Sequence, residues 1–170
     1  IIVAVGCYVQ AAKEQLEEDA LIDLVIGNNM KSQVVQIVEQ YIQDNRHTED
    51  RDAYVADIAH SHEYETMHIE PVSEHTRAYI KIQDGCNQFC SYCIIPYARG
   101  RVRSRKMEDI LQEVRNLTAN GYKEIVLTGI HISSYGLDFE HTAEEQEDYG
   151  PFKNSALIDL IEALSGIEGL

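Results

Sequence analysis

The sequence has 170 residues, 44% of them hydrophobic, and a formal net charge of −15, which together indicate a globular protein able to bury a sizeable core. No apolar run approaches the roughly 18 residues of a membrane span, and the first residues lack the features of a signal peptide. The acidic balance argues against nucleic-acid binding over the whole surface, yet residues 76–106 carry 7 basic and 1 acidic side chains. Four cysteines without a targeting signal indicate reduced thiols in the cytoplasm.

The N-terminal residues combine apolar runs with helical periodicity. Residues 1–5 and 21–26 are predicted strands buried on both faces. Helices are expected over residues 10–19 and 31–42, the second with apolar side chains at helical spacing. This order predicts the end of a parallel α/β sheet. Because it begins without a cap or an initiating Met, we expect the chain to be a fragment.

An acidic, histidine-rich segment follows and shows little apolar periodicity. Residues 43–75 are therefore predicted to be an interdomain linker, with one short extended piece around residues 53–58. His60 and His62 could hold a metal ion, but exposed linker histidines are commoner, and we expect no metal here.

Ordered structure is predicted to resume at residue 76. Residues 76–83 alternate between apolar and polar, which predicts a strand that ends at a cysteine-rich loop, where parallel α/β barrels place their chemistry. Ser104 is expected to cap the following helix, and Asn120-Gly121 to end it. Residues 124–128 form the next predicted strand.

The last part of the chain has two predicted features. Residues 137–153 are acidic and unpatterned, which favours a mobile surface loop. Residues 155–164 carry apolar side chains on one side and predict a final helix. Two βα units do not close a barrel, so the C-terminal end is also expected to be cut.

Three of the four cysteines, Cys86, Cys90 and Cys93, are spaced C-x3-C-x2-C. Three thiolates can hold three irons of a [4Fe-4S] cluster and leave one iron open, whereas ferredoxins supply four thiolates. Zinc would need a fourth ligand, and the remaining cysteine, Cys7, is nearly eighty residues away. A disulfide framework is less favoured because three close cysteines pair poorly. The spacing therefore favours an iron–sulfur cluster.

The loop and its flanks resemble a known family. Asp84-Gly85-Cys86-Asn87, Cys90-Ser91-Tyr92-Cys93-Ile94-Ile95-Pro96, Arg99-Gly100 and Ser104-Arg105 resemble the radical S-adenosylmethionine (SAM) methylthiotransferases. Residues 97–105 and 127–131 are most similar to the MtaB-type branch, which methylthiolates threonylcarbamoyladenosine at position 37 of tRNA. The resemblance implies an α/β fold: the end of a parallel-sheet (Rossmann or flavodoxin-like) domain over residues 1–42, an acidic linker over 43–75, and the start of a radical SAM partial TIM barrel over 76–170.

The resemblance also implies the roles of individual residues. Cys86, Cys90 and Cys93 would hold the cluster whose open iron binds SAM, and Tyr92 would pack near the SAM adenine. Gly129 and His131 fall where the family's glycine-rich strand end faces the SAM amino group, although the family's acidic third residue is absent. Cys7, which alone would be a small buried hydrophobe, would help hold an auxiliary [4Fe-4S] cluster, so the full-length protein would carry two.

A basic run follows the cysteine loop. It comprises Arg99, Arg101, Arg103, Arg105 and Lys106, which could form a solvated charged face or contact phosphate or the SAM carboxylate. Beside a cluster loop we favour contact with phosphate or with the SAM carboxylate, and we expect the run to matter for RNA binding. The resemblance implies tRNA and an external electron donor such as flavodoxin or ferredoxin as partners of the full-length protein. Two alternatives remain open. One is a related enzyme acting on another tRNA adenosine or on a ribosomal protein, and the other is a non-catalytic Fe–S or zinc binding module.

Overall fold

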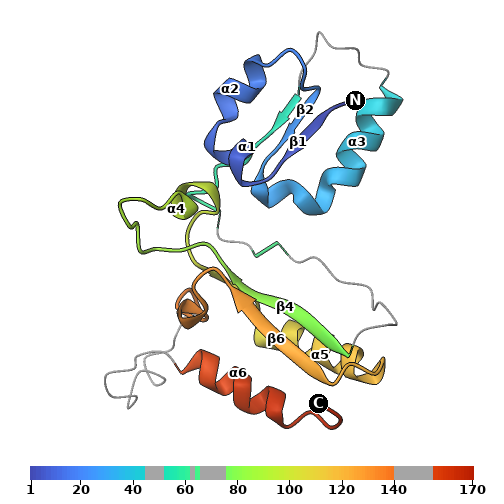
Figure 1. Cartoon of the computed structure of the whole chain (residues 1–170), viewed down its shortest axis with the longest axis vertical. Helices are drawn as coiled ribbons and strands as arrows, with labels where there is room; N and C mark the ends of the chain where they lie inside the picture. The colour runs from blue at the N-terminus through green and yellow to red at the C-terminus, as the bar shows by residue number, and fades with distance from the viewer. Residues whose placement is uncertain (45–51, 62–63, 66–75, 140–154) are drawn as a thin grey trace. The chain divides into compact units, whose positions relative to one another are not determined.

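The structure is a computed structural model that describes residues 1–44, 52–61, 64–65, 76–139 and 155–170 (Figure 1). Its contacts divide the chain into two compact units. The first unit comprises Ile1–Met67 and Cys86–Arg101, and the second comprises His68–Gly85 and Val102–Leu170. The cysteine loop thus groups with the N-terminal residues, a long-range association that the predicted division into residues 1–42, 43–75 and 76–170 did not contain. Those boundaries remain a prediction.

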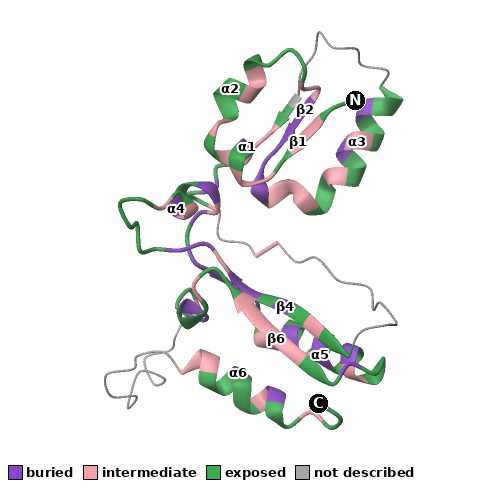
Figure 2. Ribbon diagram, in the orientation of Figure 1, coloured by how far each residue is buried: buried purple, intermediate pink, exposed green. Residues whose placement is uncertain are grey.

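A three-stranded parallel sheet organises the first unit. Its order is β1 (Val3–Val5), β2 (Leu24–Ile26) and β3 (Asp52–Tyr54). The central strand β2 is buried at all three positions because it has a neighbour on each side (Figure 2). The prediction that residues 1–5 are buried on both faces is wrong, since β1 is an edge strand and Ile1 and Val5 are exposed. The strand β3 lies in the segment predicted to be a linker and overlaps the start of the short extended piece predicted around residues 53–58.

Helices flank this sheet on two sides (Figure 1). On one side lie α1 (Cys7–Ala11) and α2 (Lys13–Glu18), in place of the single helix predicted over residues 10–19. The break falls at Ala12, whose φ of −125° and ψ of 35° are not helical. On the other side lie the 3₁₀ helix η1 (Asn28–Gln33) and α3 (Val34–Gln43). The apolar face of α3 packs on β2 as its periodicity predicted.

The second unit has the predicted strand–helix–strand order. The strands β4 (Arg77–Asp84) and β6 (Glu124–Gly129) pair in parallel, and α5 (Met107–Ala119) connects them. A short strand, β5 (Arg103–Ser104), pairs antiparallel with the end of β4. After β6 come the 3₁₀ helix η2 (Ile132–Ser134) and α6 (Ala156–Ser165). Buried residues of the strands, the helices and the turns after α5 and η2 form one core: Ile80, Ile82, Ile110, Val114, Leu117, Tyr122, Tyr135, Leu160 and Leu164.

Local chemistry explains where α5 begins and ends. The residue at its N-terminal cap is Lys106, so the prediction that Ser104 caps this helix is wrong. Ser104 instead lies in β5, and its backbone and hydroxyl bind the Asp138 carboxylate. The predicted stop is confirmed, because Asn120 is the C-terminal cap and Gly121 follows with a φ of 94°, which glycine adopts without strain.

The acidic segment after residue 137 is described only at its start. Asp138 accepts hydrogen bonds from Ser104, and Phe139 contacts the Tyr135 ring edge to face at 5.5 Å between centroids. These contacts anchor Asp138 to β5 and Phe139 to the core. Leu137 and Asp138 are exposed and lie outside any helix or strand, as expected of a surface loop, and the mobility of this loop stays a prediction. Residues 140–154 lie outside the described residues. Among the helices that the structure describes, none is long and apolar enough to cross a membrane.

Candidate iron–sulfur and SAM site

Backbone hydrogen bonds shape the cysteine loop of the first unit. The Cys86 N–H donates to the Gly100 carbonyl at 3.1 Å, which joins the two ends of the loop. The Cys93 N–H donates to the Cys90 carbonyl at 2.9 Å and makes a tight turn between these two cysteines. The one-turn helix α4 (Ile95–Ala98) follows and buries Pro96 and Ala98. The sequence therefore places three thiols on one closed loop.

The donor set of this loop fits an iron–sulfur cluster chemically. All three thiols are free, with Cys86 buried, Cys90 exposed and Cys93 half-buried. Soft thiolates are the ligands that iron–sulfur clusters require. No three His, Cys, Asp or Glu side chains in the described part of the chain are gathered into a ready metal site, and a closed zinc site would need four. The three cysteines thus have the right chemistry for the cluster, and their role as its ligands remains a prediction.

Between the cysteines, the loop carries aromatic side chains. Phe89 adopts a φ of 47°, a left-handed conformation that is uncommon for a residue with a side chain. Its ring contacts Tyr97 edge to face at 5.5 Å, and the Arg101 guanidinium lies 4.3 Å from its centroid. Tyr92 is 91% exposed, so its ring is available to a ligand such as the predicted adenine. This contact also stays a prediction.

Cys7 lies in the same unit as the cysteine loop, at the start of α1. Its thiol donates to the Asn28 side chain at 4.0 Å, and Asn28 in turn donates to the Ala98 carbonyl of α4. Burial raises the pKa of the Cys7 thiol, but hydrogen bonds with Asn28 and Arg99 and the positive charges of Arg99 and Lys31 lower it more. The pKa therefore lies below its usual value, which favours the thiolate that a metal would bind.

Gly129 and His131 lie in the second unit, at the end of β6. The His131 ring nitrogen Nδ1 contacts the Ser134 hydroxyl at 2.6 Å, and the His131 backbone N–H donates to Gln83 Oε1 at 2.9 Å. The contact of this strand end with SAM stays a prediction. Sequence reasoning missed Gln83, because simple alternation put it on the polar face of β4 with Tyr79 and Lys81.

The side chains of the basic run differ in how far they are buried. Arg101 and Lys106 are exposed and Arg99 is half-buried. Arg103 is 2% exposed and lies 4.0 Å from an Asp84 carboxylate oxygen, and Arg105 is 4% exposed and pairs with Glu113. The expected RNA contact therefore does not fit Arg103 and Arg105, since their guanidiniums are enclosed with carboxylates. The alternation in the sequence resembled a charged face, but Arg103 in β5 and Arg105 directly after it are both buried.

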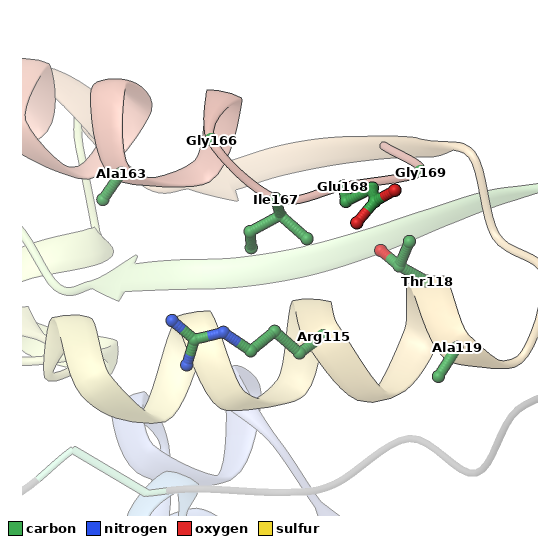
Figure 3. Close-up of a pocket in the computed structure, with 8 residues that line it drawn as sticks. All are labelled: Arg115, Thr118, Ala119, Ala163, Gly166, Ile167, Glu168 and Gly169. Atoms are coloured by element: carbon green, nitrogen blue, oxygen red, sulfur yellow. The ribbon is translucent and has the colours of Figure 1, made fainter.

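A pocket of about 520 Å³ lies in the second unit, between α5 and the turn after α6 (Figure 3). Arg115 and Thr118 line it from α5, and Ile167 and Glu168 from the turn. The turn that follows α5 lies at the N-terminal ends of β4 and β6, where the Lys123 N–H donates to the Thr76 carbonyl. Because parallel barrels carry their chemistry at the carboxyl ends of the strands, this pocket is not the candidate site.

Comparison with known proteins agrees with the motifs. Residues 80–163 match the family model of the radical SAM superfamily. The threonylcarbamoyladenosine tRNA methylthiotransferase MtaB of Aquifex aeolicus is 40% identical over 138 residues, 81% of this chain and 33% of the relative.

Relatives with other substrates are also similar. The ribosomal protein uS12 methylthiotransferase RimO of Dictyoglomus thermophilum is 34% identical, over 99% of this chain and 34% of the relative. The tRNA-2-methylthio-N(6)-dimethylallyladenosine synthase of Carboxydothermus hydrogenoformans is 39% identical, over 79% of this chain and 30% of the relative. The chain thus spans about a third of the length of the curated relatives it matches. Its cysteine motif, its α/β architecture and these similarities together show that the chain belongs to the radical SAM methylthiotransferase family.

Proposed function

We propose that the complete protein containing this segment adds a methylthio group to threonylcarbamoyladenosine in tRNA. The observation that carries the proposal is the three-cysteine loop, which lies within the stretch similar to the MtaB of Aquifex aeolicus. The family uses a [4Fe-4S] cluster and SAM, and Cys86, Cys90 and Cys93 are the residues that would hold the cluster. When bound, such a cluster supplies the electron for the reductive cleavage of SAM.

Residues around the loop would bind SAM and an auxiliary cluster. Tyr92 offers an exposed ring for the adenine of SAM, and Gly129 and His131 are the proposed contacts of its amino group. Cys7 is proposed as one ligand of an auxiliary cluster, supported by its lowered pKa and by the hydrogen-bonded link from its Asn28 partner to α4. An external donor such as flavodoxin or ferredoxin would supply the electron, and the cytoplasm is the expected location.

The RNA contact is proposed for a smaller set of residues than the sequence indicated. Arg101 and Lys106 are exposed cations, and the exposed Tyr97 lies beside the Phe89 ring that Arg101 covers. Aromatic rings and guanidiniums bind single-stranded RNA by stacking on bases and pairing with phosphates. The remaining acidic surface would repel a polyanion, so this attraction is local.

The test is mass spectrometry of tRNA nucleosides from a strain that lacks the gene. The methylthiolated threonylcarbamoyladenosine should disappear, return with the wild-type gene, and stay absent with a Cys90→Ala variant. A ribosomal protein substrate is the second candidate, because the RimO relative aligns with 99% of this chain. Should the nucleoside persist while uS12 loses a methylthio group, the tRNA proposal fails and the second candidate replaces it.

A further inference from the structure

The side chain of Gln83 is completely buried although it is polar and lies near the end of a strand. The β4–β6 pairing has a register irregularity between Lys81 and Gln83, and Ile82 and Gln83 are both buried, although period-two alternation put Gln83 on the polar face. Irregularities of this kind can redirect side chains and occur next to functional sites. The Gln83 amide lies between the ends of the two strands, where it bonds Gly85 and His131.

Every polar group of this amide has a partner. The Gln83 amide nitrogen donates to the carbonyls of Asp84 and Gly85, both at 2.8 Å. Its oxygen accepts the backbone N–H of His131 at 2.9 Å. Only one orientation of the amide satisfies these contacts, because a flip would put the NH₂ group against an N–H and the oxygen against two carbonyls.

The neighbouring strand is shaped to admit this side chain. A Cβ added to Gly129 would lie 3.0 Å from Gln83 Oε1 and 3.1 Å from Gln83 Cβ. These distances are shorter than ordinary van der Waals contact, so an alanine here would require the Gln83 side chain to shift by a few tenths of an ångström. The family resemblance assigned Gly129 to SAM binding. The close approach of Gln83 is a second physical reason for a glycine at this position.

We propose that Gln83 is a positioning residue that links the end of β4 to the end of β6. One arm of the link fixes the backbone of Gly85, which directly precedes Cys86 in the chain, and the other fixes His131. Both arms lie within the second unit, and the deduction that they serve SAM binding rests on the proposed function. Gln83 would act through the backbone it holds and would not contact substrate itself.

Hydrogen exchange of the metal-free chain tests the link directly. The change is Gln83→Met, which keeps the length of the side chain and removes all three hydrogen bonds. The His131 N–H should exchange about tenfold faster, since a partly buried donor loses its acceptor. The Val114 N–H in the core of α5 should keep its rate. Gln112→Met, the same change at an exposed position of α5, is the matched control and should leave both rates unchanged.

Two further variants keep the test decisive. Gln83→Glu retains an oxygen acceptor and should preserve the protection of His131, whereas Gly129→Ala should reduce it, by less than Gln83→Met does. An unchanged His131 rate in Gln83→Met would overturn the proposal. Equal acceleration of His131 and Val114 would also overturn it, because Gln83 would then only support the core.

SAM affinity supplies the second measurement. Calorimetry with the iron-loaded protein measures the affinity for SAM at equal iron content. SAM should bind about tenfold more weakly to Gln83→Met than to Gln112→Met, because Gln83→Met loses one buried hydrogen-bond acceptor. Equal affinities would refute the positioning role. Absence of SAM binding in wild type and control alike would contradict the proposed function, while the exchange rates would still decide whether the link exists.

Discussion

Replacing Glu113 by leucine should strongly destabilise the second unit. Glu113 is 9% exposed on α5, and its carboxylate pairs with the guanidinium of Arg105, which is 4% exposed and also donates to the Asp109 carbonyl at 3.3 Å. The variant would leave a buried cation without its counter-charge. Removing one partner of a buried ion pair costs about 3–5 kcal/mol, whereas replacing both by apolar residues is often neutral or stabilising.

The expected loss of stability is large compared with the total stability of a folded domain. A loss of about 3–5 kcal/mol is a substantial share of the typical total stability of about 5–15 kcal/mol. The double variant Arg105→Met with Glu113→Leu should recover most of it. The coupling between the two substitutions should therefore reach about 2 kcal/mol or more, near the upper part of the range measured for contacting residues.

Native-state hydrogen exchange measures this free energy within the second unit. The slowest amides of α5, at Val114 and Leu117, report its opening, and the two single variants and the double variant complete a thermodynamic cycle. Glu162→Leu on the exposed face of α6 is the matched control and should change stability by less than about 0.5 kcal/mol. A loss below about 1 kcal/mol in Glu113→Leu would refute the structural role of the pair. If the Arg105→Met variant were stable but bound tRNA more weakly, Arg105 would contact RNA as expected from the sequence.

Three more predictions follow from the site and the core. Alanine at any of the three loop cysteines should abolish iron binding after anaerobic reconstitution, while Cys7→Ala should leave this cluster in place. Iron analysis checks both results. Loss of the cluster in Cys7→Ala would contradict the ligand assignment. Replacing Arg101 and Lys106 of the complete protein by glutamate should weaken tRNA binding and flatten its dependence on salt, with the iron content unchanged. Filter binding at several salt concentrations measures this dependence. An unchanged salt slope would exclude these two cations from the interface. Burial of Tyr135, together with the charges of Glu108 and Asp138, raises the pKa of its hydroxyl to about 12. The unfolded pKa is about 10, so this contribution to stability is present below about pH 10 and is lost from there up to about pH 12; urea unfolding at alkaline pH should show a shallower decline for Tyr135→Phe, and equal declines would contradict the raised pKa.

The sequence by itself determined the chemistry and the order of the elements. The C-x3-C-x2-C spacing indicated a cluster because thiol type and spacing are properties of the chain and need no fold. The strand, helix and strand of the second unit followed from alternation, helical periodicity and the Asn120-Gly121 stop, all of which are local signals.

Tertiary structure decided what depends on contacts between distant residues. Arg103 and Arg105 resembled exposed cations until β5 and α5 enclosed them with Asp84 and Glu113. The grouping of Cys7 with the cysteine loop likewise required Asn28 to bridge segments that are far apart in the chain.

The clearest case is Gln83. Period-two alternation put its side chain on the polar face of β4, whereas in the structure it is completely buried beside a register shift against β6. That shift is a property of two paired strands and cannot be predicted from either strand alone. Sequence therefore defined which groups are available for chemistry, and the pairing of β4 with β6 decided which polar side chain holds the strand ends together.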